Sequence, residues 1–486
     1  MSMKSKEELY EKYIKPSLSD ARRRSNKDTE YTYFSLNPTT KTIGKGKYYY
    51  IETYGCQGNE ADSETMAGIL EAIGFKKASK IEESDIIILN TCAIRENAEN
   101  RAWGELGRLK SFKRNNPDLI IGFAGCMPQE EKTIKRLLEK YPHIDIVFGT
   151  HNIDKLPIYV EEAMFNKERV IEVYSKEGGI VDRLPKSRNH QYKAWVNIMF
   201  GCDEFCTYCI VPYTRGKERS RKKEDIIEEV KKLVNDGYQE ITLLGQNVNA
   251  YGKDIKNSDY TFGDLLNDLA KTKIPRIRFT TSHPHDLDQK TMDAIQNNDN
   301  VMPFFHLPVQ SGSNTILKKM NRHYTREEYI DVVKRLKEAV PGISITTDII
   351  VGFPNESEED FQDTLSLVDE CQFEGAFTFI FSPREGTPAA TFDDSINPMI
   401  KKERLRILNK KINDLYLKGN KRFVNEIVLV LVDGPSKNDE TILSGYTEHN
   451  KLVNFKGDAK MIGKIVEVRI VEARTWFLIG EQIEKN

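Results

Sequence analysis

Short apolar runs alternate with segments of helical period in the first part of the chain. The extended runs YYYIETY, SDIIILN and LIIGFAG are each followed by a segment in which apolar residues recur at helical spacing. Strands that alternate with helices in this way predict a parallel α/β sheet, which we place at residues 47–155. Each run ends in a cysteine just before its helix, and these cysteines are Cys56, Cys92 and Cys126.

A second series of strands and helices is predicted for residues 193–420. Six extended runs alternate with helical patterns, and they read WVNIMF, EITLLGQN, RIRFTTS, PFFHLPVQ, SITTDIIVGFP and FTFIFSP. Six such units indicate an incomplete TIM-like (β/α)6 parallel barrel, in which ligands bind at the carboxyl ends of the strands. The polar loops GCDEFCTYC, GQNVN, SHPHD and QSGSN all lie where strands are expected to end.

The apolar period becomes two over residues 421–486. About five short strands separated by Gly and Asp turns predict a small C-terminal β-barrel, of a kind that often binds nucleic acid. Residues 1–46 are polar and are expected to form an N-terminal extension, and residues 156–192 are expected to be a linker with a short hairpin. The pattern as a whole predicts a multidomain α/β protein.

Length and composition fit this organisation. The 486 residues suffice for about three domains of roughly 150 residues each. No apolar stretch approaches the ~18 residues of a membrane span, and the N-terminus lacks the apolar core of a secretory signal. We therefore expect a cytoplasmic protein with no membrane partner. Thiols stay reduced in that compartment, so the seven cysteines favour metal binding over disulfides.

The overall charge indicates no extended nucleic-acid surface. Lys plus Arg number 72 and Asp plus Glu number 74, which gives a net charge of -2, so any RNA site must be local. One candidate is the run 401–422, where nine basic residues face only Glu403 and Asp414 within the run. A solvated helix face is an equally good interpretation of such a run. Its basic residues are Lys401, Lys402, Arg404, Arg406, Lys410, Lys411, Lys418, Lys421 and Arg422.

Cys202, Cys206 and Cys209 form the most specific motif of the chain. A zinc site would ordinarily have a fourth ligand close by, whereas three cysteines in a C-x-x-x-C-x-x-C loop can hold an iron–sulfur cube and leave one iron open. This spacing, with Tyr208 just before the third cysteine, resembles the radical S-adenosylmethionine (SAM) enzymes. The resemblance implies a [4Fe-4S] cluster whose open iron binds SAM.

The three cysteines of the first sheet predict a second cluster. Carboxyl ends of parallel strands share one edge of a sheet, so Cys56, Cys92 and Cys126 can converge there. A 4Fe-4S cube ordinarily takes four cysteines, so three again leave one iron open. The alternative for any one of them is a buried structural cysteine. Cys371 has no partner at metal-ligand spacing, and we expect it to lie in the core.

Polar residues at the ends of the barrel strands are candidates for holding SAM. Each of them has the alternative role of satisfying its own loop backbone. The candidates are Tyr208, Gln246, Asn247, Asn249, Gln310, Ser311, Asp348, Arg215 and Arg219. Beyond the cluster ligands no catalytic residue is identified. Three histidines, His283, His285 and His306, could touch substrate or only shape their loops.

From residue 47 onward the chain resembles the radical SAM methylthiotransferases, which combine a three-cysteine sheet domain, a C-x-x-x-C-x-x-C barrel and a small terminal barrel. The flanks TYGCQGNEADSE, NTCAIRENAENR and GCMPQE are similar to those of the MiaB-type tRNA branch. That branch uses two [4Fe-4S] clusters and two SAM molecules to place a methylthio group on C2 of N6-isopentenyladenosine beside the tRNA anticodon. It also implies a TRAM RNA-binding domain, a reductant such as flavodoxin or ferredoxin, and a sulfur donor or iron–sulfur carrier.

Other functions remain open from the sequence. Related branches act on threonylcarbamoyladenosine in tRNA or on a ribosomal-protein aspartate, and a non-enzymatic iron–sulfur RNA-binding protein would need the clusters without a SAM pocket. One position departs from the family pattern, because Gly58 stands where GCQMN has Met. In the C-terminal barrel, Tyr446, Phe455 and Trp476 could stack on RNA, although core packing is the more common role of such residues.

Overall fold

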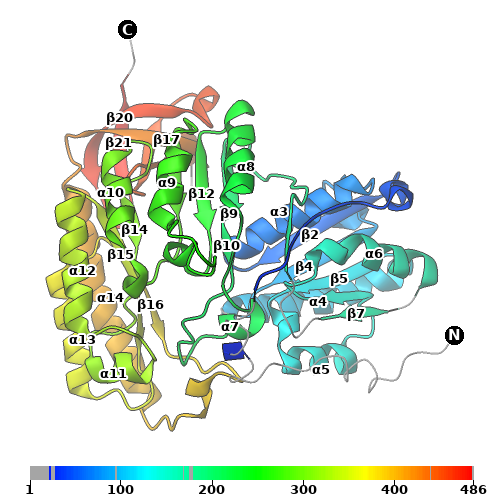
Figure 1. Cartoon of the computed structure of the whole chain (residues 1–486), viewed down its shortest axis with the longest axis horizontal. Helices are drawn as coiled ribbons and strands as arrows, with labels where there is room; N and C mark the ends of the chain where they lie inside the picture. Colours follow the sequence, from blue (N-terminus) through cyan, green and yellow to red (C-terminus); the bar gives the residue numbers. More distant parts are fainter. Residues whose placement is uncertain are drawn as a thin grey trace. The chain divides into compact units, whose positions relative to one another are not determined.

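The computed structural model describes residues 21–22, 28–93, 96–167, 169–173, 179–437 and 439–483. The chain folds into two compact units (Figure 1). The first comprises Met1–Asn189 together with two later segments, Met199–Asp203 and Ile210–Arg221. The second comprises His190–Ile198, Glu204–Cys209 and Lys222–Asn486. The boundary therefore crosses the C-x-x-x-C-x-x-C loop, with Cys202 counted in the first unit and Cys206 and Cys209 in the second.

The first unit is built on a six-stranded parallel sheet in the order β3-β2-β4-β5-β6-β7. Its strands are β2 Tyr48–Tyr54, β3 Lys76–Lys77, β4 Ile86–Thr91, β5 Ile120–Gly125, β6 Ile146–Phe148 and β7 Val170–Glu172. Its principal helices are α3 Gln57–Ala72, α4 Glu96–Asn115, α5 Glu131–Lys140 and α6 Leu156–Glu161. The predicted parallel α/β sheet is confirmed.

Two apolar cores cover the two faces of this sheet. Trp103 of α4 and Leu137 of α5 pack with Phe123 on one face, whereas Ile69 of α3 and Val160 of α6 pack with other strand residues on the opposite face. Every residue of β4 and β5 is buried. Because both faces are covered, the central strands read as continuous apolar runs rather than as alternating ones.

The sheet continues beyond residue 155, and the hairpin expected within 156–192 is wrong. β7 pairs in parallel with β6 and so adds a sixth strand. The next strand, β8 Ile180–Asp182, pairs in parallel with β1 Tyr31–Tyr33 from the polar N-terminal region. Both segments are only three residues long, so their apolar pattern was too short to separate a strand from a linker.

The second unit contains the predicted open parallel barrel. Its strands are β9 Lys193–Asn197, β12 Glu240–Leu244, β13 Arg276–Phe279, β14 Phe304–His306, β15 Ser344–Val351 and β16 Ala376–Ile380. They pair in parallel as β9-β12-β13 and β14-β15-β16, and an isolated parallel bridge between Ile277 and Val301 joins the two groups just before β14. The (β/α)6 interpretation is confirmed.

Helices follow the barrel strands along the chain. They are α8 Lys223–Asn235, α9 Phe262–Ala270, α10 Gln289–Asn297, α11 Asn314–Lys319, α12 Arg326–Ala339, α13 Glu358–Cys371 and α14 Pro398–Lys421. Three of them begin with a complete capping box, at Thr261, Thr325 and Ser357. Cys371 ends α13 as a buried core residue, as expected, and burial raises the pKa of its thiol to about 12.

The first predicted barrel strand, WVNIMF, is two strands in the structure. β9 ends at Asn197, and β10 Met199–Phe200 pairs in antiparallel fashion with β11 Arg219–Ser220. The short helix α7 Val211–Thr214 lies between β10 and β11 along the chain. This pair belongs to the first unit, so the chain leaves the second unit before the cysteine loop and returns within it.

The C-terminal residues form a closed barrel in the order β17-β18-β19-β21-β20, as predicted. The strands are β17 Ile427–Ser436, β18 Asp439–Thr447, β19 Leu452–Lys456, β20 Ile465–Ala473 and β21 Leu478–Gln482. Two arginines of β13 bind this barrel to the larger one. Arg276 donates hydrogen bonds to the carbonyls of Tyr446 (2.9 Å) and Leu429 (2.8 Å), and Arg278 donates to that of Thr447 (2.6 Å).

Candidate active site

Three cysteines meet at the carboxyl edge of the first sheet. Cys56 is the N-cap of α3, Cys92 follows β4 and Cys126 follows β5. The strands before them are neighbours in register, with Tyr54 opposite Thr91 and Thr91 opposite Gly125. The amide of Cys126 donates to the carbonyl of Thr91 at 2.8 Å, which ties two of the three loops together. The predicted convergence of these loops on one sheet edge is thus present.

Two buried asparagines fix the backbone under this edge. The Asn59 amide group donates to Asn90 Oδ1 and to the carbonyl of Thr91, each at 3.2 Å, and Asn90 donates back to the carbonyl of Asn59 at 2.8 Å. Gly125 has φ +101°, and a Cβ there would lie 2.3 Å from the carbonyl oxygen of Thr91. Only glycine therefore fits before Cys126.

Arg215 places a buried positive charge beside these thiols. Its Nη2 lies 2.7 Å from Asp62 Oδ2 of α3, and both side chains are 8% exposed. A hydrogen bond with Cys92 lowers the pKa of the Cys56 thiol to about 5, and the charge of Arg215 acts in the same direction. Burial raises the pKa of Cys126, an effect that Arg215 opposes. The edge is therefore suited to thiolates, which are the form that binds iron.

That Arg215 holds SAM stays a prediction, and the structure shows the contacts that this side chain already makes. Within the first unit its guanidinium is committed to Asp62 and to the thiols of Cys56 and Cys126. Arg219, also predicted as a SAM contact, is buried and donates to the carbonyls of Arg215 (3.0 Å) and Lys217 (3.4 Å). Both arginines thus stabilise the segment that follows the second cysteine motif.

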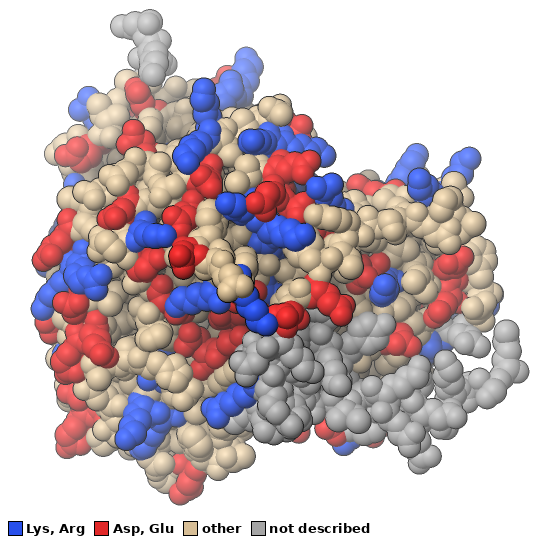
Figure 2. All heavy atoms as spheres, in the orientation of Figure 1, with Lys and Arg blue, Asp and Glu red and all other residues tan. Residues whose placement is uncertain are grey.

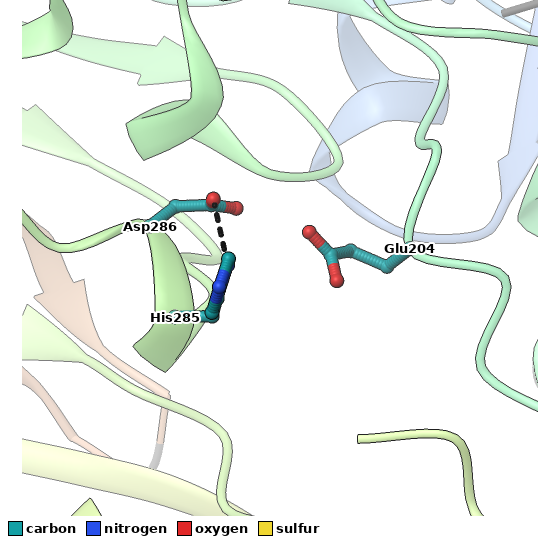
Figure 3. Close-up of side chains that lie close together, drawn as sticks. All are labelled: Glu204, His285 and Asp286. Carbon is teal, nitrogen blue, oxygen red and sulfur yellow. Dashed lines mark ion pairs between the residues drawn. The ribbon is translucent and has the colours of Figure 1, made fainter. Parts of the chain in front are cut away.

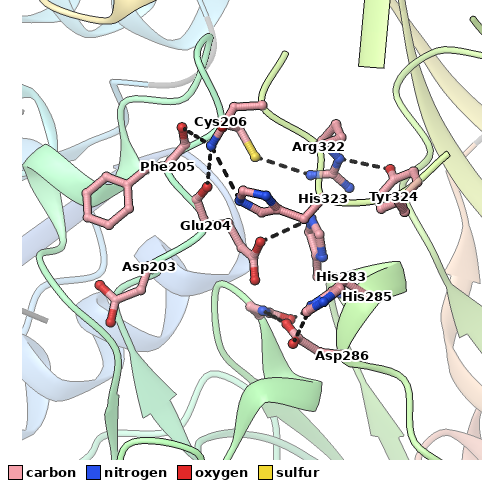
Figure 4. Close-up of polar contacts among 12 residues, drawn as sticks. Asp203, Glu204, Phe205, Cys206, His283, His285, Asp286, Arg322, His323 and Tyr324 are labelled. Carbon is pink, nitrogen blue, oxygen red and sulfur yellow. Dashed lines mark hydrogen bonds and ion pairs between the residues drawn. The ribbon is translucent and has the colours of Figure 1, made fainter. Parts of the chain in front are cut away.

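The second unit holds Cys206 and Cys209, with another buried arginine beside them. Arg322 Nη1 donates to Cys206 Sγ at 3.3 Å, while its other nitrogens donate to the Tyr324 hydroxyl (2.8 Å) and to the carbonyl of Pro308 (2.9 Å). Cys206 is 7% exposed. Figure 4 shows the Arg322 guanidinium between Cys206 and Tyr324.

A group of polar residues lies next to Cys206 at the ends of the first barrel strands. Glu204, His285 and Asp286 offer ligand atoms that lie within 4.8 Å of one another (Figure 3). Asp286 already accepts hydrogen bonds from the Lys253 ammonium and from Asn247 at 2.6 Å. Because these donors already neutralise the carboxylate, we interpret the group as a set of hydrogen bonds that connects loops rather than as a metal site.

His283 belongs to the same group and is almost completely buried. Its Nε2 lies 3.5 Å from Glu204 Oε2, and burial together with the charge of Arg322 lowers its pKa well below the usual value (Figure 4). Burial also raises the pKa of Glu204 to about 7, and the charge of Asp286 adds to this rise. The imidazole of His283 is therefore neutral.

Three of the predicted SAM contacts make hydrogen bonds within or between loops. Asn247 and Asn249 both accept a hydrogen bond from the amide of His283, at 3.1 and 2.8 Å, and Asn249 donates to its carbonyl at 2.8 Å. Ser311 is fully buried and accepts from the amide of Ser313 at 3.3 Å. These bonds link the loop after β12 to the loop after β13, and one of them lies within the loop after β14.

The remaining predicted contacts lie near the ends of barrel strands or on the cysteine loop. Gln246 is half-buried after β12, and Gln310 has φ +72° and is bridged to Ile349 of β15. Asp348 lies within β15, where its Oδ1 is 3.4 Å from His306 Nε2. Tyr208 packs beside the apolar cluster of Ile316, Met320, Phe353, Phe381 and Ala389.

The basic run of α14 is mainly structural. Arg404 pairs with Glu356 at 2.7 Å in a buried position, Lys411 with Asp369 at 2.6 Å and Arg422 with Glu374 at 2.9 Å. Their acidic partners lie outside the run, where the local sequence could not reveal them. On the face drawn in Figure 2, basic and acidic side chains are intermingled.

The aromatic residues of the C-terminal barrel have three different environments. Phe455 is 1% exposed and lies in its core, and the Tyr446 ring lies under Lys193 at 5.5 Å. Trp476 is 61% exposed, with its ring 5.1 Å from that of Tyr416 on α14. The prediction of core packing is therefore wrong for Trp476, whose side chain is exposed.

Known families match three consecutive parts of the chain. The description "Uncharacterized protein family UPF0004" covers residues 48–149, "Radical SAM superfamily" covers 196–368 and "TRAM domain" covers 421–483. Curated proteins called tRNA-2-methylthio-N(6)-dimethylallyladenosine synthase are similar over almost the whole length. That of Bacillus subtilis is 55% identical over 97% of this chain and 93% of its own, and that of Oceanobacillus iheyensis is 55% identical over 99% and 94%.

The chain belongs to this family of radical SAM methylthiotransferases. Among solved structures, the radical SAM methyltransferase TsrM from Kitasatospora setae has a TM-score of 0.53 at 14% identity, over 71% of this chain and 75% of its own. At that identity the likeness concerns the fold alone. No helix of the described residues is long and apolar enough to cross a membrane.

Both cysteine sets fit the cofactors of this methylthiotransferase family, [4Fe-4S] clusters and SAM. The chain has seven cysteines, and Cys371 lies in the core, so each set offers three thiols for a cube and leaves one iron open. Three residues that the sequence analysis missed, Asp62, Glu204 and Arg322, stand against these thiols or their loops. Their partners are distant along the chain, so no spacing could have identified them.

Proposed function

We propose that this chain methylthiolates C2 of N6-dimethylallyladenosine next to the anticodon of tRNA, using SAM and two [4Fe-4S] clusters. The observation that supports this most strongly is the set of three convergent thiols at the edge of the first sheet. The same chain carries a second three-cysteine motif, and it is 55% identical to a tRNA-2-methylthio-N(6)-dimethylallyladenosine synthase. Two open clusters suit a reaction that needs both a radical and a sulfur. The related reactions on threonylcarbamoyladenosine or a ribosomal protein are not favoured, since the Bacillus subtilis and Oceanobacillus iheyensis relatives, both 55% identical, carry the dimethylallyladenosine name.

Cys202, Cys206 and Cys209 would hold the cluster that binds SAM. Cys56, Cys92 and Cys126 would hold the cluster that carries the sulfur to be transferred. When bound, the first cluster would supply the electron for the radical chemistry of SAM, which would act at C2 of the base. The protein supplies binding, orientation and exclusion of water.

Buried arginines are the main electrostatic contribution of the chain itself. Arg215 beside Cys56 and Cys126, and Arg322 beside Cys206, offset the negative charge of thiolate ligands in a region of low dielectric constant. Asp62 fixes the position of Arg215, and Tyr324 that of Arg322. Both guanidinium groups are therefore oriented before any ligand binds.

We propose that Tyr208, Gln246 and Gln310 contact SAM. They lie on the cysteine loop and at the carboxyl ends of barrel strands, where barrels of this type bind ligands. Asn247, Asn249 and Ser311 are positioning residues, because their polar groups already hold neighbouring loops. We assign Asp348 to the substrate rather than to SAM.

The C-terminal barrel is the proposed RNA-binding part, and its exposed Trp476 can stack on an unpaired base. The target adenine has to leave its stack to reach the parallel (β/α)6 barrel, as in other enzymes that act on bases. A low-potential reductant such as flavodoxin or ferredoxin and a sulfur donor or iron–sulfur carrier complete the proposed set of partners. A cytoplasmic location remains a prediction.

The test is anaerobic turnover of the reconstituted full-length protein with SAM, dithionite, sulfide and tRNA that carries N6-dimethylallyladenosine. We expect 5'-deoxyadenosine and a 2-methylthio nucleoside, both detected by mass spectrometry after digestion. Absence of 5'-deoxyadenosine would leave only a non-enzymatic iron–sulfur protein. Formation of 5'-deoxyadenosine without the modified nucleoside, together with methylthiolation of threonylcarbamoyladenosine tRNA or a ribosomal protein, would reassign the substrate.

A further inference from the structure

Three barrel strands, β14, β15 and β16, have one well-packed face and one face that remains partly open. On the packed face, Ile345, Ile349 and Val351 of β15 are at most 1% exposed. On β16, Thr378 Oγ1 donates to Asn409 Oδ1 of α14 at 2.5 Å, so Thr378 faces that helix. Side chains alternate along a strand, so Phe377 and Phe379 point to the opposite face.

These two phenylalanines are unusually exposed for large apolar side chains in a barrel strand. Phe377 is 61% exposed and Phe379 is 46% exposed. In a closed eight-stranded barrel, layers of branched side chains fill the interior, whereas the six-stranded open barrel leaves this face without such a filling. Adjacent exposed aromatic rings of this kind mark a surface that binds an apolar ligand.

The register of the strands places polar groups beside the aromatic ones. Phe377 is opposite Asp348 of β15 and Phe379 is opposite Ile350, so these four side chains share the open face. His306 of β14 joins them, with its ring 5.9 Å from that of Phe377 and its Nε2 3.4 Å from Asp348 Oδ1. Its Nδ1 is held 3.0 Å from Thr346 Oγ1. An apolar wall thus ends in an oriented imidazole–carboxylate pair.

The open face leads to the cysteine loop. Ile350 packs against the same apolar cluster as Tyr208, which stands between Cys206 and Cys209 in the sequence. A ligand that lies against Phe377 and Phe379 is therefore on the barrel face that continues to the proposed radical source. This continuity favours, as the occupant, a part of the molecule on which the radical acts.

We infer that Phe377 and Phe379 form the binding wall for the dimethylallyl group of the target adenine, with Asp348 and His306 bonding the polar edge of the base. This inference rests on the proposed function and adds the residues that select its substrate. A five-carbon branched hydrocarbon has no polar atom, so the group itself can be recognised only through apolar contact. A carboxylate can accept the hydrogen of the N6 amine, to which that group is attached.

The experiment measures binding of two anticodon stem-loop RNAs that differ only in the target base, N6-dimethylallyladenosine or adenosine. The full-length reconstituted protein is compared with Phe377→Ala and Phe379→Ala. We expect each variant to lose about tenfold in the preference for the dimethylallyl RNA, with little change in affinity for the adenosine RNA. Phe377→Leu and Phe379→Leu should keep most of the preference, because they keep an apolar surface.

Phe165→Ala is the matched control, because Phe165 is 65% exposed in the first unit and is not part of the wall. It should leave the preference unchanged. Iron content and circular dichroism report whether each variant folds. An unchanged preference in both alanine variants would overturn the inference, as would an equal loss for both RNAs, which would indicate a surface that stacks on any base. If the unaltered protein methylthiolates neither RNA, the proposed function itself fails.

Discussion

Arg215 Nη2 lies 2.7 Å from Asp62 Oδ2, although 153 residues separate the two along the chain. Asp62 is on α3, just after Cys56, and Arg215 is six residues beyond Cys209. Both side chains are only 8% exposed, so removal of either one would leave the other charge buried without a partner. The pair therefore couples the fold of the sheet edge to the segment that follows the second cysteine motif.

Replacing Asp62 by Asn should destabilise the protein by about 3 kcal/mol, because it leaves the Arg215 guanidinium buried without its counter-charge. Chemical denaturation of the cluster-free protein measures this change. The double variant Asp62→Leu with Arg215→Met should recover much of the loss. Asp118→Asn is the control, since its pair with Lys167 is exposed on both sides, and no measurable change is expected. Equal effects of Asp62→Asn and the double variant would contradict a specific ion pair.

The two cysteine sets should separate the two halves of the reaction. Cys206→Ala should abolish 5'-deoxyadenosine formation, whereas Cys92→Ala should keep some SAM cleavage and lose methylthiolation. Each variant should retain about four of about eight irons. Iron analysis and mass spectrometry of the nucleosides provide the measurement. SAM cleavage by Cys206→Ala, or methylthiolation by Cys92→Ala, would remove the two-cluster assignment.

Gly58 tolerates a side chain despite its position near the thiols. A Cβ there would lie 3.5 Å from Cys56 Sγ and 3.6 Å from Arg215 Nη2, both ordinary contact distances. Gly58→Ala should therefore retain methylthiolation and stabilise α3 by about 0.5–1 kcal/mol, because alanine is the better helix former. Thermal unfolding and turnover test this. Gly125→Ala is the contrasting variant, and its backbone clash should prevent stable cluster binding.

The attachment of the C-terminal barrel depends on Arg278. Its Nε donates to Glu240 at 2.7 Å while its terminal nitrogens donate to two carbonyls of the C-terminal barrel, at Thr447 and Glu448. Arg278→Ala leaves the Glu240 carboxylate short of a buried partner and should cost about 3 kcal/mol. Limited proteolysis should then cut near residues 422–427 sooner than in the unaltered protein. Arg406→Ala, which removes an exposed pair within α14, should leave the cleavage rate unchanged.

The free energy of unfolding should decrease as the pH is lowered, because of His449. Burial lowers the pKa of this histidine from 6.5 to about 4, and the charge of Arg422 contributes to the shift. Below pH 6.5 His449 is protonated in the unfolded chain, whereas in the folded chain it is protonated only near pH 4. The contribution of neutral His449 to the free energy of unfolding is therefore complete above pH 6.5 and declines as the pH falls towards 4. The decline should reach about 3 kcal/mol. Denaturation of His449→Gln at pH 7 and pH 5 should show a smaller difference than the unaltered protein.

The sequence predicts the parts of this fold that depend on local periodicity. The βα alternation places the strands before Cys56, Cys92 and Cys126, and the rule that parallel strands end at one edge brings their loops together. β7 and β8 were missed because three residues carry too little pattern to outweigh their charged surroundings. The pattern of WVNIMF predicts a single strand, because the change of strand partner at Ile198 has no signature in composition.

Side-chain partners were much harder to predict than elements. Arg215 reads as a strand-end cation near the SAM motif, and nothing in its neighbourhood points to Asp62. Asn247 and Asn249 were recognised as polar loop residues, but which loop they hold depends on the packing of β12 beside β13. The basic run of α14 was ambiguous for the same reason, because its acidic partners come from other elements.

The segment Ile210–Arg221 has a consequence for how the protein can be divided. It follows the barrel motif in the sequence, yet it completes the first unit by supplying Arg215 to Asp62 and Arg221 to Asp182, both at 2.7 Å. A fragment that stops before residue 210 would leave the buried carboxylates of Asp62 and Asp182 without their arginine partners. The sheet domain is therefore not a transferable cassette, and gene fusions or domain exchanges in this family have to carry the stretch through Arg221 with it.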